Sequence, residues 1–365
     1  MTAMIKMVGT GQPIPVRFQT SRLWPLPLIG NSSRKLHHFS SENSGKLKIM
    51  FFGTDDFAVQ SLARLHQECD GGGGGCVSGL ELACLPMRSL VAAVTKYGQA
   101  NNLKMHTWPP DIDLIKQQQF DLGVVASFGK LVPRSIIQSF PLGMINVHGS
   151  LLPRWRGAAP VIHAIKNGDK KTGVTIMRVR PHKFDVGEIL ASREVEIPED
   201  MRRPELTSIM AGVGGDLLVE VLSNFTEFNR AARQQDNTMM SLAPLVDKSI
   251  SRVSWADMTE VEVYNLWRAV GDLMKLATTY SSTGHQVRIA TVLPPRVLAG
   301  APLPSDCSPG RIVFIKRSKR EKFVCVKCRT GWLAISDIFY HNKKVMSPTD
   351  FYNGLLSRPG DHKFI

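Results

Sequence analysis

Short apolar runs alternate with amphipathic stretches through the first two-thirds of the chain. Strands are expected at the apolar runs 46–52, 80–85, 122–126, 142–147 and 174–177. Asp55 or Asp56 can cap a helix whose apolar face carries Phe57, and a second helix is expected at 91–101. Strands that alternate with helices favour a doubly wound sheet, so we predict an α/β domain built on a mostly parallel, Rossmann-like sheet.

The pattern changes after about Pro244. One helix is expected at 260–270, and short alternating strands are expected at 287–293, 311–315, 323–327 and 332–336. Such a series is typical of a small, OB-like β-barrel. The polar stretch 226–237 indicates a linker between the two patterns. We therefore expect an α/β domain at 47–225, a linker at 226–245 and a β-barrel domain at 246–365.

Length and composition narrow the class of protein. The chain has 365 residues, of which 43% are hydrophobic and 21% charged, so it can bury cores of two or three domains. No apolar stretch runs uninterrupted for the ~18 residues that a membrane span needs, so we expect no membrane partner. Six scattered cysteines do not suggest a disulfide scaffold and favour a reducing compartment.

The net charge of +14 is concentrated near the two ends of the chain. Residues 1–46 hold six basic residues against Glu42 alone, and residues 311–330 hold eight against Glu321 alone. The first segment is also rich in Ser and Thr, which is typical of a mitochondrial transit peptide. We expect residues 1–46 to direct the protein to the mitochondrial matrix; a disordered basic arm is the alternative.

Polar side chains stand at the end of the apolar strand 142–147. Asn146 and His148 are two residues apart, so on a strand they point to the same face. An amide donor beside an imidazole suits a carbonyl oxygen that becomes negative during acyl transfer. No Gly-x-Gly-x-x-Gly follows the first strand, which disfavours a dinucleotide cofactor.

Farther along the chain, Asp185 stands in a tight loop between two expected strands. A carboxylate there can orient the imidazole of His148 and favour its charged form. Each residue alone also has an ordinary interpretation: a hydrogen-bonded histidine, a turn-forming aspartate, or a loop cap at Asn146. The catalytic hypothesis therefore depends on the three residues acting together.

Several motifs surround these residues: Gly53-Thr54-Asp55-Asp56-Phe57-Ala58, Ser127-Phe128-Gly129-Lys130-Leu131-Val132-Pro133, Asn146-x-His148, Ser150-Leu151-Leu152-Pro153, Arg154-Trp155-Arg156-Gly157-Ala158-Ala159-Pro160 and Asp185-x-Gly187. Together they resemble the 10-formyltetrahydrofolate-dependent formyltransferase family, and within it the members that act on methionyl-tRNA. The likeness extends over about residues 46–354 and is weaker toward the C-terminus.

The resemblance implies an activity and a set of site residues. The enzyme would transfer the formyl group of 10-formyltetrahydrofolate to the α-amino group of methionine on initiator methionyl-tRNA, as a monomer. Asn146, His148 and Asp185 match the family's catalytic residues. The residues implied to bind folate are Ser150, Leu151, Leu152, Pro153, Gly129, Leu131, Val132 and Pro133.

Contacts with tRNA are expected from basic side chains, namely Arg88, Lys96, Arg154, Lys316, Arg317, Lys319 and Arg320. Two departures from the family pattern stand out. The approach to Asp185 is one residue longer than the common bacterial pattern. The loop 86–89, which carries basic residues onto tRNA in the family, is short.

No metal site is expected. Cys325 and Cys328 form a single Cys-x-x-Cys without a second pair at suitable spacing, whereas structural zinc takes four ligands. Two other functions remain open from the sequence: formyl transfer to a sugar-nucleotide amine, or folate hydrolysis or dehydrogenation, by a sibling enzyme, and RNA binding on an inactive formyltransferase scaffold.

Overall fold

The computed structural model describes residues 45–71, 74–86, 91–341 and 344–365. Residues 45–365 belong to one compact unit. Nearly all of the segment expected to be a transit peptide, 1–46, lies outside the described residues, and so does Arg88.

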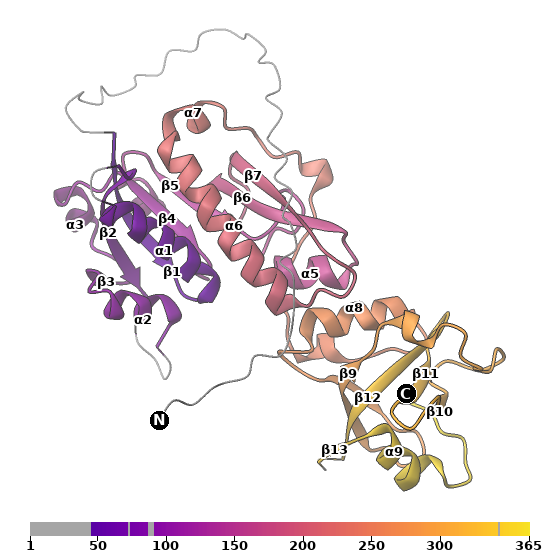
Figure 1. The fold of residues 1–365 in the computed structure, drawn as a ribbon. Coiled ribbons are helices and arrows are strands. Elements are labelled where there is room, and N and C mark those ends of the chain that lie inside the picture. The colour runs from indigo at the N-terminus through magenta and orange to yellow at the C-terminus, as the bar shows by residue number, and fades with distance from the viewer. Residues whose placement is uncertain (1–44, 72–73, 87–90, 342–343) are drawn as a thin grey trace, which may run out of the picture. The chain divides into compact units, whose positions relative to one another are not determined.

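The first domain is built on a seven-stranded sheet with the order β3-β2-β1-β4-β5-β6-β7 (Figure 1). Its strands are β1 (Leu47–Gly53), β2 (Val77–Cys84), β3 (Met105–Thr107), β4 (Leu122–Ala126), β5 (Met144–His148), β6 (Lys171–Arg178) and β7 (Ile189–Glu196). The pairs from β3 to β5 are parallel, and β6 and β7 are antiparallel to their neighbours. The expected mostly parallel sheet is confirmed.

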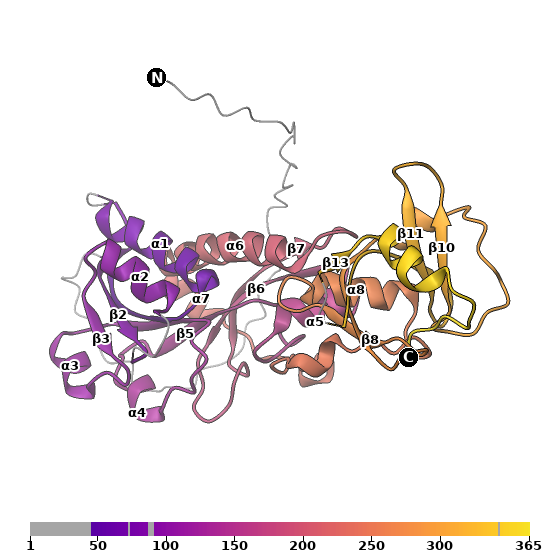
Figure 2. The ribbon, with the colours of Figure 1, turned by 90° about the horizontal axis from the view of Figure 1, so that it is seen from below.

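Helices cover both faces of this sheet, with α1, α2 and α6 on one face and α3 and α4 on the other (Figure 2). Their bounds are α1 (Asp56–Asp70), α2 (Ala93–Ala100), α3 (Ile112–Gln117), α4 (Arg134–Ile137), α5 (Pro160–Lys166) and α6 (Arg203–Ser223). Each face of the sheet has its own hydrophobic core, and successive residues of β1 point into one or the other. Phe51 packs with α1, and Phe52 packs with α3 and α4. Helices on both faces explain why the central strands β1 and β4 are almost wholly apolar and buried.

The position of β1 creates the crevice of this sheet. The chain runs from β1 to β2 on one side and later returns to β4 on the other, so strand order reverses between β1 and β4. Ligands of such sheets bind beyond the carboxyl ends of the strands at this reversal. There the hydroxyl of Thr54 donates to the carbonyl of Ser127 at 2.5 Å, and the carboxylate of Asp55 caps α1 by accepting from Ala58 N.

Helix α6 is the one helix of the described residues that is long and apolar enough to cross a membrane. Asp216 and Glu220 interrupt its apolar run, and nine of its residues are buried against the rest of the protein. Core helices of soluble proteins pass the same test of length and composition.

The expected linker is partly helical. Helix α7 (Phe225–Arg230) begins one residue after the Asn224 that ends α6, and a 3₁₀ turn follows at Asn237–Met239. The side chain of Phe225 is buried in the core of the sheet domain and holds this helix there, and the expected linker bounds of 226–245 stay a prediction.

The second domain contains a six-stranded antiparallel sheet with the order β10-β11-β12-β9-β8, in which β13 also pairs with β12. Its elements are α8 (Glu260–Val270), β8 (Leu276–Thr279), β9 (Gln286–Val292), β10 (Ile312–Lys316), β11 (Lys322–Lys327), β12 (Trp332–Tyr340), β13 (Val345–Met346), α9 (Pro348–Phe351) and 3₁₀ turns at Lys248–Ser251 and Pro295–Leu298, with a π-turn at Tyr352–Leu356. The strands β8 and β13 were not expected from the sequence.

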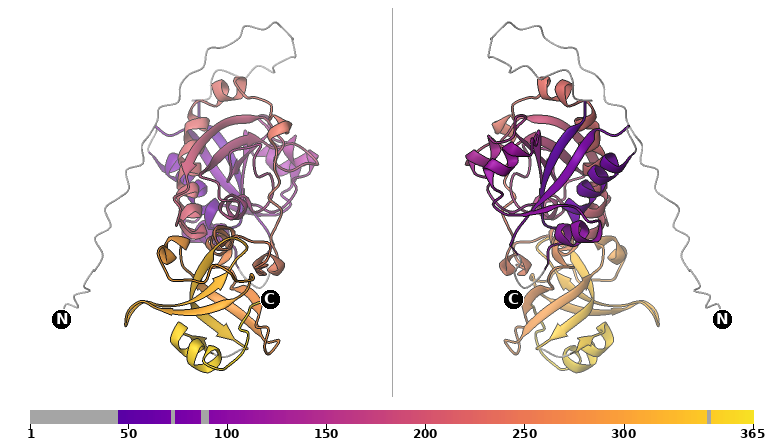
Figure 3. Two further views of the ribbon diagram at one scale, coloured as in Figure 1. Left: turned by 90° about the vertical axis from the view of Figure 1, so that its right-hand side faces the viewer. Right: turned by 90° about the vertical axis from the view of Figure 1, so that its left-hand side faces the viewer.

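Residues 362–365 close this sheet into a barrel. Phe364 bridges Tyr280 beside β8, and Lys363 bridges Arg311 at the start of β10. The orange and yellow strands of this domain cross one another in the views of Figure 3. The small barrel expected from the strand pattern is confirmed, and its closure depends on a segment that carried no strand signal.

Candidate active site

Asn146 and His148 lie on the same face of β5, at its carboxyl end. β5 is held between β4 and β6, with Asn146 opposite Val125 and Met177. A strand fixed from both sides cannot slip in register, so its alternating side chains keep their direction. Asn146 is half-buried, and none of the described residues forms a hydrogen bond with its side-chain amide.

His148 is buried, with 6% of its surface exposed. Its Nε2 lies 3.0 Å from the carbonyl oxygen of Trp155. A carbonyl can only accept, so Nε2 carries the hydrogen and Nδ1 is the nitrogen left for other partners. Nδ1 lies 3.6 Å from Asp185 Oδ1, which is too long for a hydrogen bond but close enough for an ion pair once the ring is protonated.

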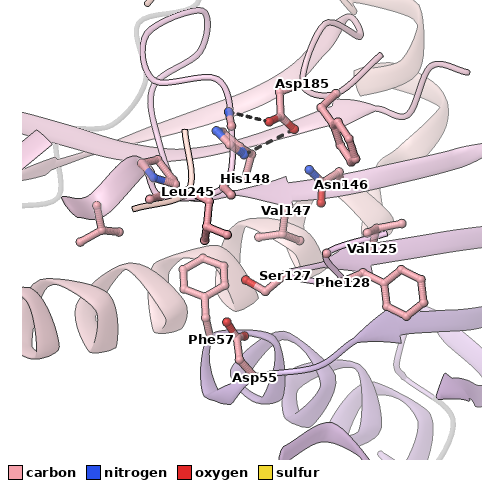
Figure 4. Close-up of a pocket in the computed structure, with 18 of the residues that line it drawn as sticks. Asp55, Phe57, Val125, Ser127, Phe128, Asn146, Val147, His148, Asp185 and Leu245 are labelled. Carbon is pink, nitrogen blue, oxygen red and sulfur yellow. Dashed lines mark hydrogen bonds and ion pairs between the residues drawn. The ribbon is translucent and has the colours of Figure 1, made fainter. Parts of the chain in front are cut away.

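Asp185 reaches this position from the loop between β6 and β7. Its backbone adopts a left-handed conformation, with φ of +55°. Its Oδ2 accepts a hydrogen bond of 2.9 Å from the backbone N–H of Gly157, and its Oδ1 faces His148. The longer approach to Asp185 therefore still brings the carboxylate to the imidazole. Figure 4 shows Asn146, His148 and Asp185 together at one side of the pocket.

These three side chains line a cavity of about 780 Å³. Its apolar lining includes Phe57, Val125, Phe128, Val132, Val147, Met177 and Val179. The C-terminal part of the chain adds Leu245, Val246, Leu273 and Met274. A large, mostly apolar cavity with a few grouped polar side chains is the usual form of a small-molecule site.

Asp55 also lines the cavity, across from Asn146, His148 and Asp185 (Figure 4). Burial raises the pKa of its carboxyl, although the backbone N–H of Ala58 and the side chain of Ser127 lower it. The sequence analysis named Asp55 as a possible helix cap and as part of a motif, but not as a site residue. Its place directly after β1, at the reversal of strand order, is the signal that could have marked it as a cavity residue.

Comparisons with known proteins agree with this geometry. A model of the formyl transferase family matches residues 91–222, and a model of the formyl transferase C-terminal domain matches residues 245–356. The human protein named mitochondrial methionyl-tRNA formyltransferase is 35% identical over 311 residues, which cover 85% of this chain and 78% of the human protein. This chain belongs to the methionyl-tRNA formyltransferase family.

More distant proteins share parts of the same architecture. The methionyl-tRNA formyltransferase of Ruminiclostridium cellulolyticum is 30% identical over 320 residues, covering 84% of this chain and 96% of that one. The crystal structure of WlaRD, a sugar 3N-formyl transferase studied with dTDP and 5-N-formyl-THF, has a TM-score of 0.55 at 18% identity. It covers 82% of this chain and 99% of that chain. The latter likeness concerns the fold alone.

The residues expected to bind folate separate into two groups in this formyltransferase. Gly129, Leu131 and Val132 line the cavity, whereas Pro133 is not among its lining residues. Ser150–Pro153 do not line it either. The hydroxyl of Ser150 is buried and donates to the carbonyl of Arg154 at 2.7 Å, so it is turned into the loop. Ser150 thus shapes the loop beside His148, and contact of Ser150–Pro153 with folate stays a prediction.

The basic side chains expected to contact tRNA differ in whether they already have partners within the protein. Arg154 makes a two-pronged contact with Asp169, at 2.6 and 2.9 Å, and stacks over the ring of Trp155. Arg317 donates to the carbonyls of Val297 and Ala299, so its guanidinium also has a structural partner.

The remaining basic candidates that the structure describes are exposed. Lys316, Lys319 and Arg320 lie at the end of the β10–β11 hairpin, which projects from the barrel (Figures 2 and 3). Lys96 is exposed on α2.

The cysteine pair of the barrel is fully buried. Cys325 and Cys328 have 0% exposure, and burial raises the pKa of each thiol to about 12. Within the described ranges, no three His, Cys, Asp or Glu side chains are grouped as a metal site would require.

Proposed function

We propose that this formyltransferase transfers the formyl group of 10-formyltetrahydrofolate to the α-amino group of methionine on initiator methionyl-tRNA. The observation that carries the proposal is the grouping of an amide, an imidazole and a carboxylate around one apolar cavity. The mammalian relatives named for this activity, which cover most of the chain, support the choice of substrate.

The cavity suits a flat heterocycle with one reactive edge. Its volume of about 780 Å³ falls within the range of ~300–1,000 Å³ that drug-sized ligands occupy. Phe128 and Val132 offer apolar walls, and Gly129 and Leu131 complete a segment that could carry the pterin ring. In this arrangement the formyl carbon would lie toward Asn146 and His148.

The chemistry follows from the three side chains. A methionyl α-amino group has a pKa of ~7.7–8.0, so a useful fraction is neutral and can attack the formyl carbon without an enzyme nucleophile. A new C–N bond forms, and the carbonyl oxygen becomes negative. Asn146 stabilises this oxyanion from the moment of attack, and His148 does so once its Nδ1 has taken the proton that the amine loses; a single such donor contributes ~2.7–4 kcal/mol.

Collapse of the intermediate breaks the bond from the formyl carbon to N10 of folate. The attacking amine must lose a proton and N10 must gain one, so one proton transfer balances the reaction. Nδ1 of His148 is the ring nitrogen left for this transfer, because Nε2 is held by Trp155. Asp185, beside Nδ1, stabilises the protonated ring.

The acceptor is proposed to meet the barrel through its phosphates. Lys316, Lys319 and Arg320 are exposed on a projecting hairpin, which suits contact with a polyanion that is independent of base sequence.

A formylation assay with the purified protein tests the proposed function. Four acceptors are compared with 10-formyltetrahydrofolate as donor: methionyl initiator tRNA, methionyl elongator tRNA, free methionine and a dTDP-amino sugar. Formylation of charged tRNA far above free methionine supports the proposal. Formylation of the sugar nucleotide alone would favour the sibling activity, and binding of tRNA without any transfer would favour an inactive scaffold.

The proposed location is the mitochondrial matrix. The basic, Ser-rich composition of residues 1–46 and the mitochondrial names of the mammalian relatives support it. Import of the full chain into isolated mitochondria tests this, with protease treatment after rupture of the outer membrane. Protection from protease supports the matrix, and digestion at that step contradicts it.

A further inference from the structure

Gln235 lies in the segment that the sequence assigned to a linker, yet it is buried beside the catalytic loop, with 9% of its surface exposed. Its Nε2 donates two hydrogen bonds, one of 3.0 Å to the carbonyl of Asp185 and one of 2.8 Å to the carbonyl of Gly187. One side-chain amide therefore holds the backbone on both sides of residue 186.

A buried arginine determines which way this amide points. Arg156 donates from Nε and Nη2 to Oε1 of Gln235, at 2.9 and 2.6 Å, and from Nη2 to Asn237 at 2.9 Å. A guanidinium can only donate, so Oε1 must face Arg156 and Nε2 must face the two carbonyls. The orientation of Gln235 thus follows from its partners.

The backbone that Gln235 holds is under strain. Asp185 has φ of +55°, a left-handed conformation that costs a residue other than glycine free energy unless its surroundings enforce it. A carboxylate on such a turn keeps its direction only while the turn is held. The two hydrogen bonds from Gln235 bracket this turn, while the side chain of Asp185 contacts Gly157 and His148.

We propose that Gln235 is a positioning residue that acts on formyl transfer through Asp185. Gln235 does not line the cavity, so it acts on the reaction indirectly, and its two hydrogen bonds to the Asp185 turn are the route that this proposal names. This inference rests on the proposed function, and it assigns a catalytic contribution to the segment that joins the two domains.

The paired variants are Gln235→Glu and Gln234→Ala. Glutamate at 235 can still accept from Arg156, but it offers no N–H to the carbonyls of Asp185 and Gly187. Gln234 is exposed and its amide donates to Glu188, so alanine at 234 removes one surface hydrogen bond, adds no charge beside Glu188 and leaves the turn's anchors in place.

We expect Gln235→Glu to lower kcat about 10- to 100-fold, as misplacement of a catalytic group by ~1 Å can do, with KM for methionyl-tRNA within about 2-fold of wild type. Gln234→Ala should stay within about 2-fold of wild type in both parameters. Melting temperatures of both variants show whether a loss of activity reflects unfolding.

A double-mutant cycle with Asp185→Asn separates positioning from a general loss of structure. If Gln235 acts through Asp185, adding Gln235→Glu to Asp185→Asn should change kcat by no more than about 2-fold. An equal loss in both backgrounds would overturn the inference while leaving the proposed function intact.

Hydrogen exchange gives a readout that needs no activity. Peptides that cover residues 183–188 should exchange faster in Gln235→Glu than in wild type, and unchanged exchange there would contradict the inference. If the wild-type chain formylates no methionyl-tRNA, the proposed function fails and the exchange measurement alone decides whether Gln235 holds this turn.

Discussion

Replacing Gly157 by alanine should disturb both the stability of the protein and its catalytic pair. Gly157 has φ of +127°, which L side chains rarely adopt. A Cβ there would lie 2.5 Å from the carbonyl oxygen of Ala243 and 2.9 Å from its carbonyl carbon. The N–H of Gly157 also donates to Asp185, so a shift of this residue moves the carboxylate.

The magnitude follows from two costs. A residue forced into a sparsely populated backbone region costs ~1–3 kcal/mol, and overpacking of a tight contact costs ~1–3 kcal/mol. Part of each cost is relieved by movement of the 241–243 segment, so we expect a loss of about 3 kcal/mol. At ~2–4 °C per kcal/mol for domains of 150–250 residues, the melting temperature should fall by roughly 6–12 °C. Formyl transfer should fall by about 100-fold if the carboxylate moves by ~1 Å.

Thermal unfolding and steady-state formylation of the purified variant measure both effects. Gly212→Ala is the matched control, because a Cβ at this position in α6 meets nothing within 4 Å. Alanine in a helix is favoured over glycine by ~1 kcal/mol, so this control should be as stable as wild type or more stable. If Gly157→Ala melts within about 2 °C of wild type and keeps its activity, the close contact between the catalytic loop and the 241–243 segment is refuted.

Three further predictions concern the barrel. Replacing Lys319 and Arg320 with glutamine should weaken tRNA binding. It should also reduce the slope of log affinity against log salt by roughly 1 for each phosphate contact that is lost. An unchanged slope would show that these two side chains do not contact tRNA phosphates. Burial and a hydrogen bond to an aspartate raise the pKa of Tyr264 to about 12, against ~10 in an unfolded chain. Its stabilising contribution is therefore complete below pH ~10 and lost as pH rises toward 12. The deficit in melting temperature of Tyr264→Phe should shrink over that range, and a deficit independent of pH would contradict the assignment. The thiols of Cys325 and Cys328, whose pKa is about 12, should resist a thiol reagent at pH 8 until the protein is denatured, and labelling in the folded state would show that they are not buried.

The elements with strong local signals could be predicted from the sequence. The strand at β4 and the helix at α8 agree with the expected bounds, because each is a clear apolar run or periodic face. The grouping of Asn146 with His148 could also be predicted, since it needs only the two-residue period of a strand.

Features that depend on contacts between distant segments could not be predicted. Ser241 and Ala243 form backbone hydrogen bonds with the catalytic loop at Arg156 and Ala159, and no local pattern in the sequence indicates such a partner. The closure of the barrel by residues 362–365 was missed for the same reason.

The orientation of the loop Ser150–Pro153 could not be predicted either. Its expected role in folate binding came from the family resemblance and stays a prediction. In the structure Thr175 donates to the carbonyl of Ser150 and accepts from the N–H of Leu152. These hydrogen bonds join residues more than 20 positions apart in the sequence, so no local pattern indicates them.

The most direct test of the central claim is the single-turnover rate of formyl transfer by Asn146→Ala and His148→Ala, each with saturating methionyl initiator tRNA and 10-formyltetrahydrofolate. Removing one oxyanion donor costs ~10²–10³ in rate, so each variant should be at least about 100-fold slower than wild type while remaining folded. Rates within a few-fold of wild type for both variants would contradict the claim that these side chains perform the transfer.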